Sequence, residues 1–197
     1  MDPMRSDRRS ARIRIRKARA DEFERLREIA IAAKGHWGYE PALVQEWAAG
    51  GEFEPESLSK RLVYAAIDEA EGEPVGWASL IPRGEVGWLE DLWIEPGWIG
   101  HGLGRLLFAH IGSRALELGA KRLEWEAEPN ARGFYERMGA AYVRDSDETE
   151  WGRVLEVLGL TLRAGTSERT RPNSNASGVI AESKRLGPNR PGSVSHP

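Results

Sequence analysis

Residues 95–112 read EPGWIGHGLGRLLFAHIG, and the order of features in this stretch decides the fold. A proline and four glycines stand between the β-rich run EVGWLEDLWI and a leucine-rich run; the glycines are Gly97, Gly100, Gly102 and Gly104. This order predicts a strand, a tight loop and a helix. Glycines ahead of a helix let an anion approach the free N–H groups of its first turn. The stretch therefore predicts a phosphate site.

The neighbours of these glycines narrow the choice of phosphate ligand. A P-loop needs Lys and Ser or Thr directly after its last glycine, where Leu103 and Gly104 stand instead. A dinucleotide fingerprint needs a third glycine where this chain has Arg105, and it opens a chain rather than following several strands. The remaining pattern is a strand, a proline and x-x-G-x-G at the start of a helix, with Arg105 as a nearby positive charge. A glycine-rich turn that only caps a helix is the alternative without a ligand.

Outward from the loop, periodicity and breakers predict the remaining elements. Upstream we expect a strand, two helices and three strands, in residues 12–19, 20–35, 41–47, 61–68, 75–82 and 85–96. Downstream we expect a helix, a strand, a short helix and two strands, in residues 103–118, 121–128, 130–139, 140–145 and 153–162. The order β-α-α-β-β-β-α-β-α-β-β predicts an α/β fold with a mixed, largely antiparallel central sheet, one parallel step and helices on both faces.

Two local expectations follow from the same patterns. Asp21 is suited to cap the first helix, with Glu24 three residues later. In the strand before the loop, alternation predicts one face with Val86, Trp88, Glu90, Leu92 and Ile94, and the other with Gly87, Leu89, Asp91 and Trp93. Glu90 and Asp91 would then point to opposite sides of the sheet.

The composition of the chain limits the classes of function that it can have. The 197 residues predict a basic N-terminus (1–11), one domain (12–162) and a disordered Ser/Pro/Arg-rich tail (163–197). The net charge of −3 gives no case for nucleic-acid binding, and no apolar run of about 18 residues predicts a membrane span. The start has no apolar core of a secretory signal, so we expect a cytoplasmic protein. Cysteine is absent and the four histidines are scattered, so we expect neither a cysteine nucleophile nor a metal site.

Two motifs together resemble the GNAT N-acyltransferase superfamily. One is the Gly100/Gly102/Gly104 loop after a strand, and the other is NARGFYERMGA (130–140), which is similar to the family block N-x-x-x-F-Y-x-x-x-G-F. The expected order of elements along residues 12–162 agrees with this resemblance. Two departures stand out: Ile99 replaces the Arg or Gln that usually opens the loop, and Ala140 replaces the final aromatic.

The resemblance implies a GNAT-like fold and acetyl-CoA as cofactor. The implied contacts are the pyrophosphate on the amides of the loop, the pantetheine arm along the strand before it, and one asparagine on that arm. In this sequence the positions are Leu92, Trp93, Ile94, Ile99, Gly100, His101, Gly102, Leu103, Gly104, Arg105 and Asn130, with Tyr135 near the thioester sulfur.

The implied reaction is transfer of an acetyl group to a primary amine by direct attack in a ternary complex. It needs an acid for the leaving thiolate, for which Tyr135 is the candidate, and a base for the amine proton. We favour Glu90 as the base, with Asp91 and a water relay as alternatives, and either carboxylate could instead only pair with an arginine. A strand amide near Leu92 or Trp93 is the expected oxyanion donor. By resemblance, residues 34–39 cover the acceptor site, which makes Trp37, Tyr39 and Glu90 the candidate substrate contacts; the two aromatics could equally form a hydrophobic plug.

Other functions remain open from the sequence. The domain could bind acyl-CoA without turnover, as a sensor or interaction module, or it could be a nucleotide-binding enzyme of Rossmann type. The acceptor could be a small molecule or a peptide amine, and edge strands allow a homodimer.

Overall fold

The computed structural model describes residues 12–50, 53–148 and 152–163, all within one compact unit. The expected N-terminus (1–11) and, apart from Arg163, the expected tail (163–197) lie outside the described residues. A seven-stranded sheet forms the centre, in the order β1-β2-β3-β4-β5-β7-β6. The strands are β1 (Ile13–Lys17), β2 (Leu62–Asp68), β3 (Pro74–Arg83), β4 (Val86–Ile94), β5 (Arg122–Ala127), β6 (Ala141–Asp145) and β7 (Glu156–Thr161). The helices are α2 (Phe23–His36), α3 (Pro41–Ala49), α4 (Pro55–Ser59), α5 (Leu103–Glu117) and α6 (Arg132–Arg137).

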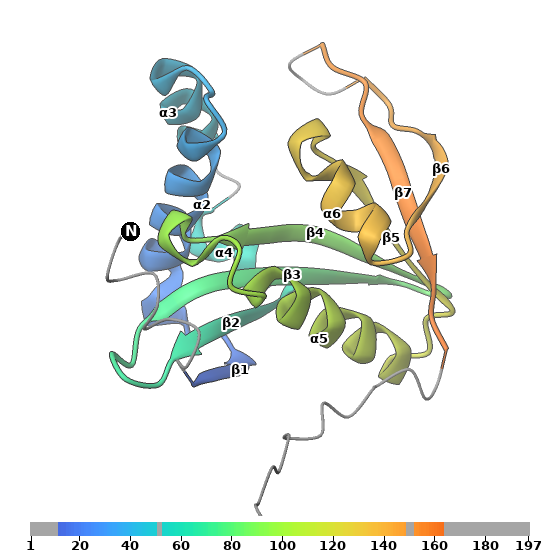
Figure 1. The fold of residues 1–197 in the computed structure, drawn as a ribbon, viewed down its shortest axis with the longest axis horizontal. Coiled ribbons are helices and arrows are strands. Elements are labelled where there is room, and N and C mark those ends of the chain that lie inside the picture. Colours follow the sequence, from blue (N-terminus) through green and yellow to red (C-terminus); the bar gives the residue numbers. More distant parts are fainter. Residues whose placement is uncertain (1–11, 51–52, 149–151, 164–197) are drawn as a thin grey trace, which may run out of the picture. The chain divides into compact units, whose positions relative to one another are not determined.

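Helices cover both faces of the sheet, as predicted. Figure 1 shows α5 along one face, and α2 and α3 on the opposite face. Alternation along β2 accounts for this division. Tyr64 and Ala66 enter the core under α5, whereas Ala65 and Ile67 enter the core under α2 and α3. The short helix α4 was not predicted.

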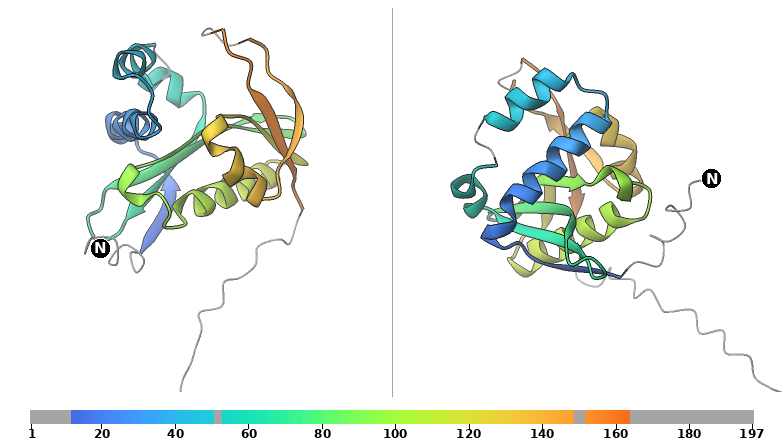
Figure 2. Two further views of the ribbon diagram at one scale, coloured as in Figure 1. Left: turned by 45° about the horizontal axis from the view of Figure 1, so that its top comes forward. Right: turned by 90° about the vertical axis from the view of Figure 1, so that its left-hand side faces the viewer.

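The sheet is antiparallel except between β4 and β5, which is the predicted parallel step across α5. These two strands pair only over residues 86–88 and 122–124, although β4 continues to residue 94 and β5 to residue 127. Their later residues diverge, as Figure 2 also shows. The second half of β4 therefore presents an open strand edge in the middle of the sheet.

A β-bulge in β4 corrects the predicted alternation. Ser79 pairs with Asp91 and Leu80 pairs with Leu89, so Glu90 is the extra residue without a partner in β3. A bulge shifts the register, so side chains after it change faces relative to those before it. The expected shared face of Trp88 and Leu92 is therefore wrong. Leu92 and Ile94 instead pack with Leu89 against the core under α5, and the pairing of Trp88 with Ile81 puts Trp88 on the face of Asp91.

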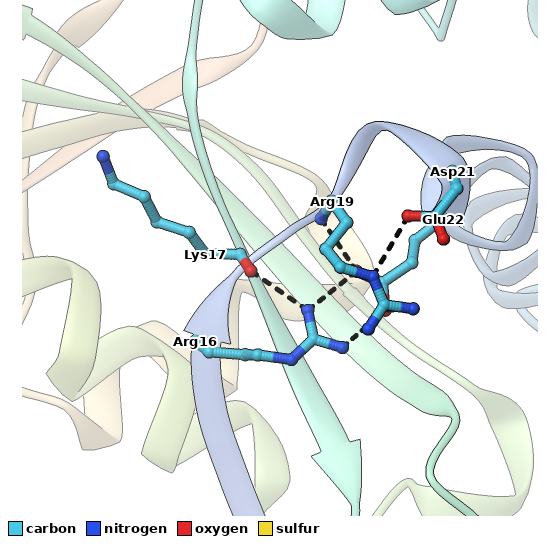
Figure 3. A network of polar contacts seen from close by, with 5 residues as sticks. All are labelled: Arg16, Lys17, Arg19, Asp21 and Glu22. Carbon is cyan, nitrogen blue, oxygen red and sulfur yellow. Dashed lines mark hydrogen bonds and ion pairs between the residues drawn. The ribbon is translucent and has the colours of Figure 1, made fainter.

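The start of α2 differs from the predicted cap at Asp21. A 3₁₀ turn (Ala20–Glu22) precedes the helix, and the buried carboxylate of Glu22 accepts a 2.8 Å hydrogen bond from the backbone N–H of Arg19. The guanidinium of Arg16 donates two further bonds to the same carboxylate, of 2.8 and 2.5 Å (Figure 3). Glu22 therefore joins β1 to α2, while Asp21 is exposed and pairs with the Arg19 side chain at 3.1 Å.

Candidate functional site

A cavity of about 610 Å³ lies at the open edge of β4. Its walls come from α2 and the connection to α3, from β4 and the glycine loop, and from the end of β5 and α6. The sequence-predicted residues that line it are Trp37, Tyr39, Glu90, Leu92, Trp93, Ile94, Ile99, Gly100, Gly102, Gly104, Arg105, Asn130 and Tyr135. Residues separated by almost 100 positions thus meet in one space.

His101 and Leu103 are the two predicted positions that do not line the cavity. The side chain of Leu103 is buried in the core under α5 and therefore does not point into the cavity. His101 has a buried Nδ1 with no hydrogen-bond partner in the part of the chain that the structure describes.

The glycine loop presents backbone donors to this cavity. Gly100 and Gly102 have φ of 85° and 84°, a region that L-residues avoid, and a Cβ added to either meets no described atom within 4 Å. Hydrogen bonding within α5 begins where the amide of Leu106 donates to the carbonyl of Gly102 at 3.1 Å. The amides of the first turn therefore have no partner within the helix, and they carry the positive end of its dipole.

Two arginines add positive charge beside these amides. Arg105 belongs to the first turn of α5 and Arg137 to the end of α6, and both line the cavity. Within residues 12–50, 53–148 and 152–163, neither guanidinium has a hydrogen-bond or ion-pair partner. This combination of amides and arginines suits a phosphate-bearing ligand.

Tyr135 is held rigidly in the cavity wall by aromatic neighbours. Its ring lies 4.8 Å from that of Trp125 and 5.8 Å from that of Phe108, centroid to centroid. The residue is 7% exposed, and burial, followed by the charge of Glu128, raises the pKa of its hydroxyl above the ordinary value of 10. The phenol therefore stays protonated at neutral pH and is available as a proton donor.

Glu90 and Asp91 have different environments. Glu90 lines the cavity, where its carboxylate accepts a 2.7 Å hydrogen bond from Nε1 of Trp88. Asp91 is buried, bound to Arg61 at 2.7 Å and to the hydroxyl of Ser79. Arg61 also lies 3.9 Å from the carboxylate of Glu90, so the arginine pairing considered for either residue occurs for both and is closer for Asp91. Of the two, only Glu90 lines the cavity.

Two further carboxylates follow on β5 and beyond it. Glu126 lines the cavity, and burial together with the neighbouring charge of Glu90 raises its pKa. Glu128 accepts a 2.6 Å bond from the hydroxyl of Tyr39 and pairs with Arg153 at 3.3 Å and Lys34 at 3.8 Å. Glu128 therefore links the α2–α3 connection to the segment before β7.

Sequence reasoning missed the charged lining residues Lys34, Glu126, Glu128 and Arg137. For the two acids a signal was present. In KRLEWEAE the inward residues Leu123, Trp125 and Ala127 alternate with glutamates at 124, 126 and 128, so the opposite face of that strand is acidic from residue 124 onward. No comparable signal marks Arg137, whose direction depends on how α6 packs.

Within the described residues, no helix is long and apolar enough to cross a membrane, and no group of three or more His, Asp or Glu is arranged to hold a metal ion.

Comparison with known proteins gives a consistent picture. A sequence model described as "Acetyltransferase (GNAT) family" matches residues 20–140. One curated relative, the L-ornithine N5-acetyltransferase NATA1 of Arabidopsis thaliana, is 32% identical over 80 residues, which is 39% of this chain and 32% of the relative. The matched segment thus spans about a third of that relative.

Solved structures share the fold. The PaiA N-acetyltransferase of Thermoplasma acidophilum, in complex with coenzyme A, superposes with a TM-score of 0.64 at 16% identity and covers 76% of this chain and 99% of that one. A GCN5-related N-acetyltransferase of Rhodopseudomonas palustris gives 0.63 at 21% identity, over 76% and 95%. At these identities the likeness concerns the fold alone.

Proposed function

This chain belongs to the acetyltransferase (GNAT) family, and we propose that it transfers an acetyl group from acetyl-CoA to a primary amine by direct attack in a ternary complex. When bound, acetyl-CoA supplies the activated acetyl thioester. The observation that carries the proposal is the single cavity that joins the amides of the glycine loop, the open edge of β4, Glu90 and Tyr135.

The residues of the cavity fit coenzyme A. The two glycines with positive φ leave room in front of the first amides of α5, and Arg105 and Arg137 provide charge for phosphate groups. The edge of β4 beyond residue 88 has no strand partner on the side of β5, so its backbone is available to an extended amide-bearing arm. Ile99 lines the same space without a polar side chain, so the backbone and the two arginines would hold the pyrophosphate.

Two side chains would handle the protons. As the C–N bond forms and the C–S bond breaks, Tyr135 would donate a hydrogen bond and then a proton to the leaving sulfur; burial keeps its hydroxyl protonated at neutral pH. Glu90 accepts the proton that the amine nitrogen releases, directly or through water. Trp37 and Tyr39, at the α2 side of the cavity, form part of the acceptor wall.

Thiol release tests the proposal. Purified protein is incubated with acetyl-CoA and a panel of amines that includes ornithine, as the name of the curated relative suggests, small alkyl amines and a peptide with a free N-terminus. We expect release that depends on an amine, and acetylated amine by mass spectrometry. Tight binding of acetyl-CoA in calorimetry, with no turnover of any amine, would favour the non-catalytic acyl-CoA sensor. Binding of NAD without coenzyme A would contradict both readings.

A further inference from the structure

Apart from the ion pair of Lys34 with Glu128, the cations and the carboxylates that line the cavity come from different elements. Among the described residues, the cations without a hydrogen-bond or ion-pair partner are Arg105, from the first turn of α5, and Arg137, from α6. The carboxylates of Glu90 and Glu126 come from the strands β4 and β5. A bound phosphate group would explain Arg105 and Arg137. The proposed reaction needs one base, which is Glu90, so it does not explain the second carboxylate, Glu126.

In the part of the chain that the structure describes, Glu126 has no partner that would explain it as a structural residue. Among the described residues no hydrogen bond or ion pair reaches its carboxylate. Arg83 and Arg144 lie within electrostatic range. Both guanidinium groups are held over the ring of Trp88, however, at 4.4 and 6.0 Å from its centroid. Arg144 also donates to Glu124 at 2.7 Å.

Glu126 is the less compensated of the two carboxylates: Glu90 lies 3.9 Å from the guanidinium of Arg61, whereas no ion pair reaches Glu126 among the described residues. Glu90 and Glu126 each lie two residues beyond the last paired positions of β4 and β5, Trp88 and Glu124, so they flank the start of the open edge. Burial, followed by the negative charge of Glu90, raises the pKa of Glu126. A cation placed between them would remove this cost, as Lys34 and Arg153 already do for Glu128.

A second, independent feature points to a ligand in the same space. The hydroxyl of Tyr135 faces the cavity from a residue that is only 7% exposed, and no described group hydrogen-bonds to it. The hydroxyl oxygen is not among the fully buried polar atoms, so it is accessible from the cavity and can hydrogen-bond to a ligand there.

We infer that the acceptor carries a second positive charge besides its reacting amine, and that Glu126 binds that charge while Glu90 faces the reacting amine. The inference rests on the proposed acetyl transfer and specifies its substrate class as aliphatic diamines and basic amino acids. Glu126 is thus a specificity-determining residue and not part of the chemistry.

Three acceptors of equal chain length test this: diaminobutane, aminobutane and aminobutanoate, whose far ends are positive, neutral and negative. For the unaltered protein we expect kcat/KM to fall in that order, by about tenfold or more per step, since a charge-assisted contact is lost and then replaced by repulsion. Glu126→Gln should lower kcat/KM for diaminobutane about tenfold, mainly through KM, and leave aminobutane unchanged. Glu126→Lys should place aminobutanoate ahead of diaminobutane. Glu24→Gln, at an exposed position of α2 outside the cavity, is the matched control and should change none of these values.

The outcomes separate this inference from the proposed function. Turnover of aminobutane and diaminobutane at equal efficiency, with equal effects of Glu126→Gln on both, would overturn the inference and leave acetyl transfer standing. If no amine is acetylated, the proposed transfer fails, and calorimetric titration of diaminobutane into the CoA-loaded protein decides the rest. Binding weakened about tenfold by Glu126→Gln would support the cation site, and equal or absent binding in both proteins would refute it. Thermal melting of each variant checks that it is folded.

Discussion

Replacement of Gly102 by alanine measures how much the conformation of the glycine loop contributes to cofactor binding. Gly102 precedes α5 with φ of 84° and ψ of −1°, and the added methyl group would meet no described atom within 4 Å. The perturbation is therefore conformational rather than steric. An L-residue in this left-handed region costs about 1–2 kcal/mol.

The strain can lower either the stability of the protein or its affinity for coenzyme A, and two different measurements distinguish these effects. If the loop keeps its shape, the free energy of unfolding falls by about 1–2 kcal/mol. If the loop relaxes, binding must restore it, and the same energy raises the Kd for coenzyme A by about 5- to 30-fold. We expect most of the effect in the Kd, because the loop is a surface segment with open space around it. Urea unfolding and isothermal titration with coenzyme A measure the two quantities.

Gly84→Ala is the matched control. Gly84 lies in the β3–β4 turn with φ of 64°, also with no described atom within 4 Å of an added Cβ, and it is outside the cavity. It should lose stability and keep the Kd of the unaltered protein. A Kd for Gly102→Ala within twofold of the original value would refute the view that the loop conformation holds the cofactor.

Three further perturbations have defined outcomes. Tyr135→Phe should lower kcat about a hundredfold to ten-thousandfold in steady-state assays, because the proton donor is lost, while calorimetry finds the affinity for coenzyme A unchanged. Glu22→Gln should cost about 1.5–3 kcal/mol at pH 7, since the charged bonds from Arg16 are lost. The Arg16 bonds lower the pKa of Glu22 in the folded protein. Their contribution is therefore present above the unfolded pKa of about 4.5 and is lost as pH falls through the lower folded pKa. In urea unfolding from pH 7 to pH 3, the free energies of unfolding of the variant and of the unaltered protein should become equal. Gly87→Ala should destabilise by about 1–3 kcal/mol in the same assay, because its Cβ would lie 2.7 Å from that of Ala115 in α5.

Each of these changes has a control of the same chemistry. Tyr142→Phe, at an exposed position of β6, should leave kcat unaltered. Glu28→Gln, on the exposed side of α2, should show no pH-dependent difference. Gly112→Ala, inside α5 with 3.5 Å to the nearest atom of Leu162, should stabilise the protein by about 0.5–1 kcal/mol. Equal losses of stability at positions 87 and 112 would contradict the packing argument.

The sequence predicts most of the fold because proline and glycine residues clearly mark where strands and helices end. Proline and glycine divide the chain into runs with clear periods of 2 or 3.6, and those runs give the order of strands and helices around α5. The buried face of β5 was also predicted: Leu123, Trp125 and Ala127 are buried as expected. The five-residue α4 was missed because one turn and a half is too short for a period to register.

The misses at the site have a common physical origin. The run VGWLEDLWI does not alternate strictly between polar and apolar residues, so the bulge at Glu90 leaves no mark in the sequence and only the pairing with β3 reveals it. The cap at Glu22 depends on Arg16 of the preceding strand, and the position of Glu126 beside Glu90 depends on which strands are neighbours. Such features arise from contacts between elements, whereas periodicity reports only on one element at a time.

The divergence of β4 from β5 has a consequence for solubility. A strand with unpaired backbone groups is a template for aggregation when it lies on the outside of a protein. Here the unpaired length of β4 lies in the middle of the sheet and borders a cavity, with α2 and α6 contributing to its walls. The exposed backbone groups of this strand therefore face a walled space and not the outer rim of the sheet, where pairing with a second protein needs no opening between elements.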